Sequence, residues 1–136
     1  MHITVKNLLD IENNIKDNLN NLNINNYPKI IAVSKTFKID KILPLIDHGH
    51  TDFGENIAQE AIEKWTEIKK NNSQIKLHMI GKLQTNKVKF ALKLFDFIHS
   101  LDSEKLAKKI AEEQTKQNLK PKIFIQINIG NEPQKS

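Results

Sequence analysis

Short β-branched runs alternate along this chain with longer segments whose apolar residues recur at helical spacing. The alternation recurs about every twenty to twenty-five residues, which is the pattern of consecutive βα units. Parallel strands joined in this way need a helix at each crossover, and the chain offers one between each pair of runs. The sequence therefore predicts an α/β fold with a parallel sheet.

The element boundaries follow from hydrophobic spacing and from turn residues. The expected strands lie at Ile30–Ser34, Asp52–Gly54, Lys76–Ile80, Phe95–Ile98 and Lys122–Ile129, and the expected helices at Lys6–Leu22, Ile39–Asp47, Asn56–Lys70, Lys87–Leu94 and Ser103–Asn118. Trp65 falls on the apolar stripe of its helix, which indicates core packing and not a binding function. In the last strand, the isoleucines are expected to face the helices, and Phe124, Gln126 and Asn128 to point inward and need partners.

Lys35 directly follows the first expected strand, Ile30–Ser34, which is an unbroken apolar run. Such a run predicts a strand that is buried on both faces, as in parallel α/β sheets, whose chemistry lies at the carboxyl ends of the strands. Desolvation there would favour the neutral amine, which can form a Schiff base with an aldehyde. The alternative interpretation is a solvated surface lysine.

Four blocks of sequence together point to one family. They are Ala32–Thr36, Phe53–Asn56, His78–Lys87 and Ile125–Asn128, in this order. From about Ile30 onward the chain resembles the pyridoxal 5′-phosphate homeostasis protein family, and the His78–Lys87 block resembles its signature. The resemblance implies a single-domain (β/α)8 TIM barrel of the alanine racemase N-terminal domain type. It also implies that the cofactor, pyridoxal 5′-phosphate (PLP), is held as a Schiff base on the lysine that matches Lys35.

The resemblance implies four cofactor-binding residues, Lys35, Asn56, His78 and Gly81. The Asn56 amide would reach the cofactor ring or its 3′-oxygen, although asparagine there also suits the N-cap of the next helix. His78 would face inward near the pyridine ring, and the alternative is a satisfied core histidine. Gly81 suits a tight turn after its strand, with close approach to a ligand as the second interpretation.

Other polar residues carry weaker predictions. Gln84, Asn86 and Lys87 belong to the signature block and would either line the barrel mouth or cap and solvate a helix start. His99 and Asp102 flank the end of the fourth expected strand and would form an acid/base pair, or Asp102 would simply start the next helix. The sequence has no metal-ligand spacing, P-loop or dinucleotide glycine fingerprint.

Composition limits the classes of partner. All 21 basic residues are lysines, and the net charge is +5. Arginine, which is absent, is the usual side chain for bidentate guanine and phosphate contacts. We therefore interpret the positive charge as keeping the protein soluble and expect no nucleic-acid partner. Cysteine is absent, and no stretch has the length and apolar character of a membrane span or signal core. These features predict a cytoplasmic protein with no membrane partner.

Length conflicts with a complete barrel. A (β/α)8 barrel has eight strands and typically about 250 residues, whereas this chain supplies five expected strands in 136 residues. We therefore expect a single domain, 1–136, that is a truncated N-terminal part of a PLP-binding barrel. The family's phosphate-binding groups would lie beyond it. Exposed edges predict a chain that is poorly folded or oligomeric alone, although the full-length family member is expected to be a monomer.

The function implied is intracellular PLP homeostasis, in which the protein captures and releases the cofactor and buffers its free level without established catalysis. The alternative is a PLP-dependent amino-acid racemase, since both functions use a lysine Schiff base. A racemase also needs an acid/base on the opposite face of the cofactor, and alanine racemase relatives take a tyrosine from a second domain for it. Tyr27 is the only tyrosine here and precedes the first strand, which disfavours the enzyme.

Overall fold

The computed structural model describes residues 1–130, and the last residues of the expected C-terminal loop lie outside this range. Five parallel strands form one sheet in the order β1-β2-β3-β4-β5, which is also their order along the chain. The strands are β1 (Ala32–Val33), β2 (Asp52–Glu55), β3 (Lys76–Met79), β4 (Phe97–Leu101) and β5 (Lys122–Ile125). The helices are α1 (Ile3–Asn21), α2 (Ile39–His48), α3 (Ala58–Asn71), the 3₁₀ turn η1 (Thr85–Lys87), α4 (Val88–Leu94) and α5 (Glu104–Gln117).

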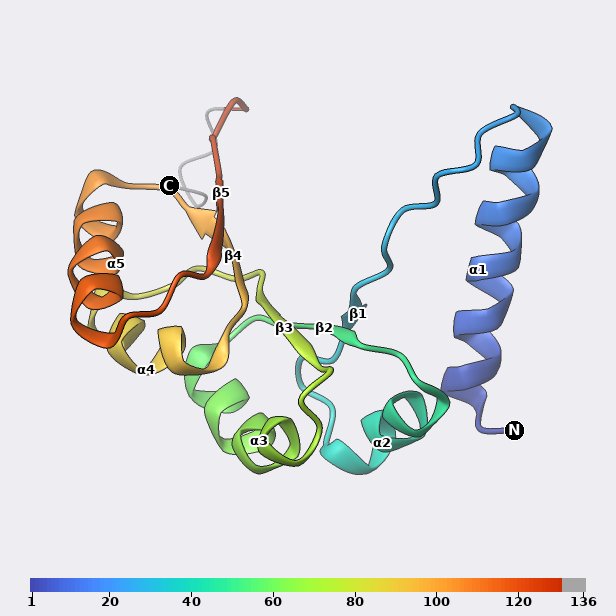
Figure 1. Cartoon of the computed structure of the whole chain (residues 1–136), viewed down its shortest axis with the longest axis horizontal. Coiled ribbons are helices and arrows are strands. Elements are labelled where there is room, and N and C mark those ends of the chain that lie inside the picture. The colour runs from blue at the N-terminus through green and yellow to red at the C-terminus, as the bar shows by residue number, and fades with distance from the viewer. Residues whose placement is uncertain (131–136) are drawn as a thin grey trace.

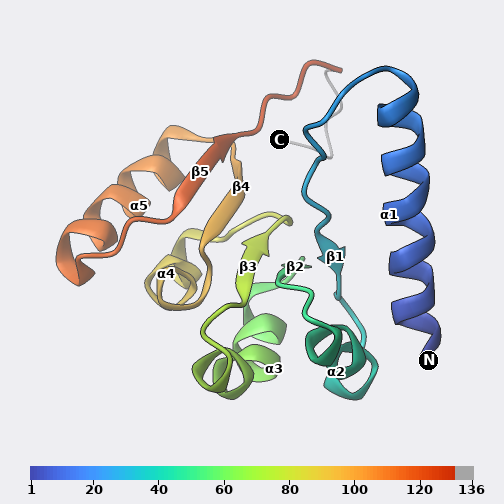
Figure 2. The same ribbon diagram turned by 45° about the vertical axis from the view of Figure 1, so that its right-hand side comes forward.

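The sheet curves, and the crossover helices α2, α3, α4 and α5 form an arc along its outer side (Figures 1 and 2). Helix α1 stands next to the β1 end of the sheet and packs against α2. The opposite, concave face of the sheet carries no helix in the described part of the chain. This arrangement confirms the predicted α/β class, with five strands placed as in part of a (β/α) barrel.

The core lies between the sheet and the helix arc. Side chains that alternate along the central strands point outward into it, among them Phe53, Leu77 and Ile98, which are all fully buried. Trp65 of α3 is also fully buried and packs against Phe53 with ring centroids 5.0 Å apart. The prediction that Trp65 belongs to the core is confirmed.

Local sequence signals fix several helix ends. Gly49 ends α2 in the left-handed region with φ 104°, as a C-cap glycine does. Ser103 caps α5, because its side-chain oxygen accepts a hydrogen bond from the backbone N–H of Leu106. Helix α1 begins three residues before the predicted Lys6, since the ring of His2 accepts the backbone N–H of Thr4 and serves as its cap.

Strand β4 lies later than the predicted Phe95–Ile98 segment. Phe95 still belongs to the end of α4, because its N–H donates to the carbonyl of Ala91. The strand runs over Phe97–Leu101, so that His99 lies within the strand and not beyond its end. The hydrophobic pattern alone placed the start of the strand too early, because apolar residues continue from the last turn of α4 into the strand.

The two outer strands are shorter and more exposed than predicted. The expectation that Ile30–Ser34 forms a strand buried on both faces is wrong, because Val33 is 49% exposed on the uncovered concave side. Beyond β5, Gln126 and Asn128 are also exposed, which contradicts the expectation of buried amides. Ile125, Ile127 and Ile129 are exposed too, so only Ile123 of that set packs against the core.

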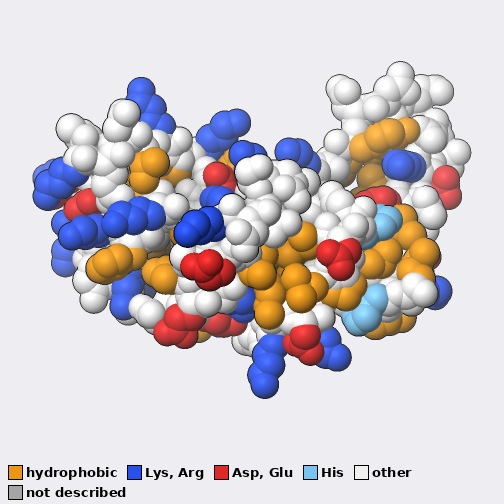
Figure 3. Space-filling view, turned by 60° about the horizontal axis from the view of Figure 1, so that its bottom comes forward, with side chains coloured by type: hydrophobic (Ala, Val, Ile, Leu, Met, Phe, Trp, Pro, Cys, Tyr) orange, Lys and Arg blue, Asp and Glu red, His pale blue; other side chains and the backbone are white. Residues whose placement is uncertain are grey.

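The outer surface divides by residue type. Figure 3 shows lysines gathered towards the side of α4 and α5, and apolar side chains towards the side of α2. A cavity of about 370 Å³ lies between the start of α1, β1 and α2, and Phe37 and Ile42 contribute to its lining. Within residues 1–130, no helix combines the length and the apolar character that crossing a membrane requires.

Candidate functional site

Three of the four predicted site residues meet at the carboxyl edge of neighbouring strands. Lys35 follows β1, Asn56 follows β2 and Gly81 follows β3. The backbone ladder continues past the strand ends, because Ser34 N–H donates to the Gly54 carbonyl (2.9 Å) and Ile80 N–H to the Glu55 carbonyl (3.0 Å). Parallel strands in register therefore bring these loops together at one edge of the sheet.

Gly81 lies directly against Asn56. A Cβ placed on Gly81 would be 2.1 Å from the Asn56 carbonyl oxygen and 2.6 Å from its side-chain Oδ1. The glycine is thus required by the close approach of two loops of the protein itself. The alternative interpretation of Asn56 as a helix cap is wrong, since Ile57 occupies the N-cap position of α3.

The backbone around Lys35 is fixed by polar groups beneath it, while the Lys35 side chain itself is exposed. Ser34 is buried and its hydroxyl donates a short hydrogen bond to Glu55 Oε2. Thr36 adopts φ 66°, which is unusual for a β-branched residue, and its N–H donates to Glu60 Oε1 at 2.6 Å. These contacts hold the turn that carries the candidate nucleophile.

Glu55 is fully buried, and the sequence prediction gave it no function. Its Oε2 accepts hydrogen bonds from Trp65 Nε1 and from Lys64 Nζ, both at 3.0 Å. Lys64 is 9% exposed and also reaches the Ser34 carbonyl at 2.7 Å. A buried carboxylate needs such donors. The sequence signal that could have indicated a buried Glu55 was its place at a strand end, with a lysine and a tryptophan on the next helix.

His78 occupies the concave face, between a carboxylate and a second histidine. Its Nε2 lies 2.8 Å from Asp52 Oδ2, and its Nδ1 lies 2.9 Å from His99 Nε2. Because a carboxylate only accepts, the Nε2–H of His78 donates to Asp52, and one of the two rings donates across the contact between His78 and His99. His78 is 4% exposed and both its ring nitrogens have protein partners, as expected of a satisfied core histidine.

Aromatic rings extend the row of side chains that Asp52, His78 and His99 form on the concave face. Phe97 stacks on His78 with ring centroids 4.1 Å apart, and Phe124 stacks on His99 at 4.7 Å. The inward orientation predicted for Phe124 is therefore confirmed, and its ring lies 53% exposed on the concave face.

The ionisable groups of the row respond to this environment. Burial alone would raise the pKa of Asp52, but hydrogen bonds from His78 and Thr51 and the charge of Lys29 outweigh it and lower the pKa. Burial, together with the neighbouring His78, lowers the pKa of His99. The row is thus arranged for an ionised Asp52 and a neutral His99 near pH 7.

The other sequence predictions have different outcomes. The His99–Asp102 pair is wrong, since within residues 1–130 the ring of His99 bonds to His78 and makes no contact with Asp102. Gln84 precedes the η1 turn, and Lys87 Nζ donates to the Gln59 side chain of α3 at 3.1 Å. No group of three or more potential metal ligands occurs within the described residues.

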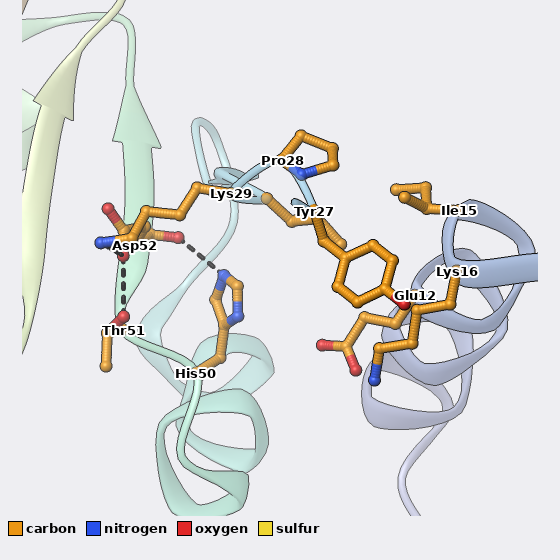
Figure 4. A pocket seen from close by; sticks show the side chains of 10 residues that line it. Glu12, Ile15, Lys16, Tyr27, Pro28, Lys29, His50, Thr51 and Asp52 are labelled. Carbon is orange, nitrogen blue, oxygen red and sulfur yellow. Dashed lines mark hydrogen bonds and ion pairs between the residues drawn. The ribbon is translucent and has the colours of Figure 1, made fainter. Parts of the chain in front are cut away.

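A separate cavity of about 330 Å³ opens at the other end of the strands (Figure 4). Residues at the starts of β1 and β2, including His50 and Asp52, face Glu12 and Tyr27 across it. The Tyr27 hydroxyl donates to Asn20 Oδ1 at 2.6 Å, which ties the segment before β1 to α1. The only tyrosine of the chain therefore lies away from the edge that carries Lys35.

Residues 7–132 match the family model described as the alanine racemase N-terminal domain. The chain belongs to this family. Among curated relatives, a pyridoxal phosphate homeostasis protein of Buchnera aphidicola is 43% identical over 116 residues, covering 82% of this chain and 50% of that protein. The corresponding protein of Pasteurella multocida is 38% identical over 108 residues, covering 79% and 46%. The resemblance drawn from the four blocks is confirmed, and the chain spans about half the length of these curated relatives.

Solved structures agree with this assignment. PipY of Synechococcus elongatus without PLP superimposes with a TM-score of 0.75 at 35% identity, covering 90% of this chain and 57% of PipY. The same protein with PLP bound gives a TM-score of 0.70 at 35% identity, covering 85% and 55%.

The groups at the strand edge fit an aldehyde cofactor of this kind. Lys35 supplies an exposed primary amine on an anchored turn, and Asn56 supplies an amide beside it, on the loop after β2. Gly81 leaves no side chain between that amide and the next loop. A primary amine can hold an aldehyde, and an amide can hydrogen-bond to a ring hydroxyl, so these two groups are compatible with such a cofactor.

Proposed function

We propose that this chain holds PLP through Lys35 and contributes to intracellular PLP homeostasis. Lys35 would supply the primary amine that holds the aldehyde group of the cofactor, and the bound cofactor would supply its electron-withdrawing ring. Reversible holding of this kind would let the protein buffer the free concentration of the cofactor without turning over a substrate. The observation that carries the proposal is the exposed Lys35 on an anchored turn at the carboxyl edge of the sheet.

Two further residues are proposed to contact the cofactor. Asn56 lies on the loop after the neighbouring strand β2, so its amide is the nearest candidate for hydrogen bonding to the ring oxygen. Gly81 acts by holding its loop close to Asn56, where any side chain would displace the amide. Both roles concern orientation of the cofactor and not its covalent attachment.

His78 is proposed to act from the concave face. Its ring nitrogens are engaged by Asp52 and His99, and its face stacks on Phe97. Because only 4% of His78 is exposed, it would act by supporting the concave face near the pyridine ring. The engagement of both its ring nitrogens makes His78 a poor proton carrier, which favours a binding role.

The racemase alternative lacks a specific supporting observation. It requires a second acid/base that faces the cofactor opposite Lys35. Tyr27 is bonded to Asn20 near the starts of the strands, and His99 has a lowered pKa and bonds to His78. Neither residue is offered to a ligand at the Lys35 edge, so we keep homeostasis as the proposed function.

The test is covalent trapping of PLP on the purified chain. The chain is titrated with PLP, reduced with borohydride and mapped by peptide mass spectrometry. Saturable labelling is expected at Lys35 and is expected to disappear in Lys35→Ala, while Lys41→Ala, which removes a nearby exposed lysine, should label like the unaltered chain. Weak labelling spread evenly over the lysines would contradict the proposal.

A further inference from the structure

Both peptide bonds that flank Lys35 are held by one cluster of charged side chains. The carbonyl of the Ser34–Lys35 peptide accepts a hydrogen bond from Lys64 Nζ at 2.7 Å. The N–H of the Lys35–Thr36 peptide donates to Glu60 Oε1 at 2.6 Å. Lys64 and Glu60 are one turn apart on α3 and form an ion pair of 3.2 Å, so the two anchors are themselves joined.

Glu55 completes the cluster from β2. It is fully buried, and its carboxylate accepts hydrogen bonds from Lys64, Trp65 and the Ser34 hydroxyl. The cluster thus combines the end of β2 with α3 and clamps the turn after β1 from beneath. A buried ion pair of this kind contributes little net stability compared with well-packed apolar residues, so its presence calls for another explanation.

The conformation of Thr36 gives that explanation. A β-branched residue with φ 66° is strained, and a turn left to itself would relax. The hydrogen bond from Thr36 N–H to Glu60 holds the strained turn, and the turn fixes the direction in which Lys35 leaves the backbone.

We infer that Glu55, Glu60 and Lys64 are positioning residues that fix the backbone of Lys35 for capture of an aldehyde cofactor. The inference rests on the proposed function of Lys35 and extends it to three residues that contact the Ser34–Thr36 turn. Preorganisation of this kind speeds a reaction because the amine does not have to be oriented at the moment of attack.

The experiment uses Glu60, because its removal leaves Lys64 paired with Glu55 and so strands no buried charge. Glu60→Ala removes the acceptor of Thr36 N–H, whereas Glu60→Gln keeps an acceptor at the same place. Glu63→Ala is the matched control, since Glu63 is exposed on the same helix and bonds to Gln59 instead of the turn. Two quantities are measured, the hydrogen exchange of the Thr36 amide and the rate of borohydride-trapped PLP labelling at Lys35.

Glu60→Ala is expected to lose protection of the Thr36 amide and to label Lys35 about tenfold more slowly. Glu60→Gln should recover most of both, and Glu63→Ala should change neither. Thermal unfolding of each variant separates positioning from general destabilisation. Loss of Thr36 protection with an unchanged labelling rate would overturn the inference alone, whereas absence of selective labelling in the unaltered chain would overturn the proposed function and the inference with it.

Discussion

Gly81 and Asn56 lie so close that a methyl group on Gly81 would be 2.1 Å from the Asn56 carbonyl oxygen. Gly81→Ala must therefore displace one of the two loops, and we expect a loss of about 2–4 kcal/mol in the free energy of unfolding. Urea denaturation measures it. Gly49→Ala is an informative comparison, because a Cβ on Gly49 would have no atom within 4 Å. Its loss of stability would therefore arise from the backbone angle φ 104° alone. That variant should lose only about 1 kcal/mol. Equal losses in the two variants would show that the loops do not touch.

Asp96 joins three elements through one carboxylate. Its Oδ2 accepts hydrogen bonds from Lys69 Nζ at 2.6 Å and from Leu77 N–H at 2.9 Å, and so links α3 and β3 to the start of β4. Asp96→Ala leaves a cation and an amide without this partner, and we expect a loss of about 1.5–3 kcal/mol on chemical denaturation. Asp17→Ala, at an exposed position of α1, is the control and should be neutral within error. A neutral Asp96→Ala would argue that water replaces the carboxylate.

The lowered pKa of His99 predicts a pH dependence of stability. Because the folded pKa lies below the ordinary value of 6.5, the unfolded chain binds the proton more readily, and stability falls as the pH drops through 6.5 towards the folded value. The lowered pKa of Asp52 acts in the same direction, but only as the pH falls past 3.8.

The contribution of His99 is isolated by a variant. His99→Gln retains a donor for His78 but does not titrate, so its stability should vary less than that of the unaltered chain between about pH 5 and about pH 7. Thermal unfolding followed across this range measures the difference. The other groups facing the row, namely Asp52, His78, Lys29 and Lys122, are present in both proteins. Parallel pH profiles would exclude His99 as the titrating group.

Local signals predicted most of the fold. The expected helix limits at Asp47 and Ser103 agree closely with the structure, because the left-handed C-cap at Gly49 and the side-chain N-cap at Ser103 depend only on adjacent residues. The alternation of helix and strand patterns predicted the parallel sheet correctly, because these patterns are also local in the sequence. The boundary of β4 was missed because Phe95 is apolar, whereas its N–H bonds to the Ala91 carbonyl and it serves as the C-cap of α4.

The candidate site was less accessible to prediction. Lys35 was identified by its position after an apolar run, but Asp52 and Glu55 were not singled out. Their partners, His78 and Lys64, lie on other elements, and only the register between strands and the packing of α3 bring them together. The His99–Asp102 pair failed for a related reason. His99 lies within β4 with its ring bonded to His78, whereas Asp102 lies beyond the end of the strand.

Because spatial order equals chain order in this sheet, every strand finds its partner roughly twenty residues away. No described strand depends on a distant segment of the chain for its pairing. Each βα unit can dock on the one before it as synthesis proceeds from the N-terminus, so that the newest strand always forms one edge of the described sheet. The turn that carries Lys35 is then completed early, as soon as β2 and α3 have followed β1.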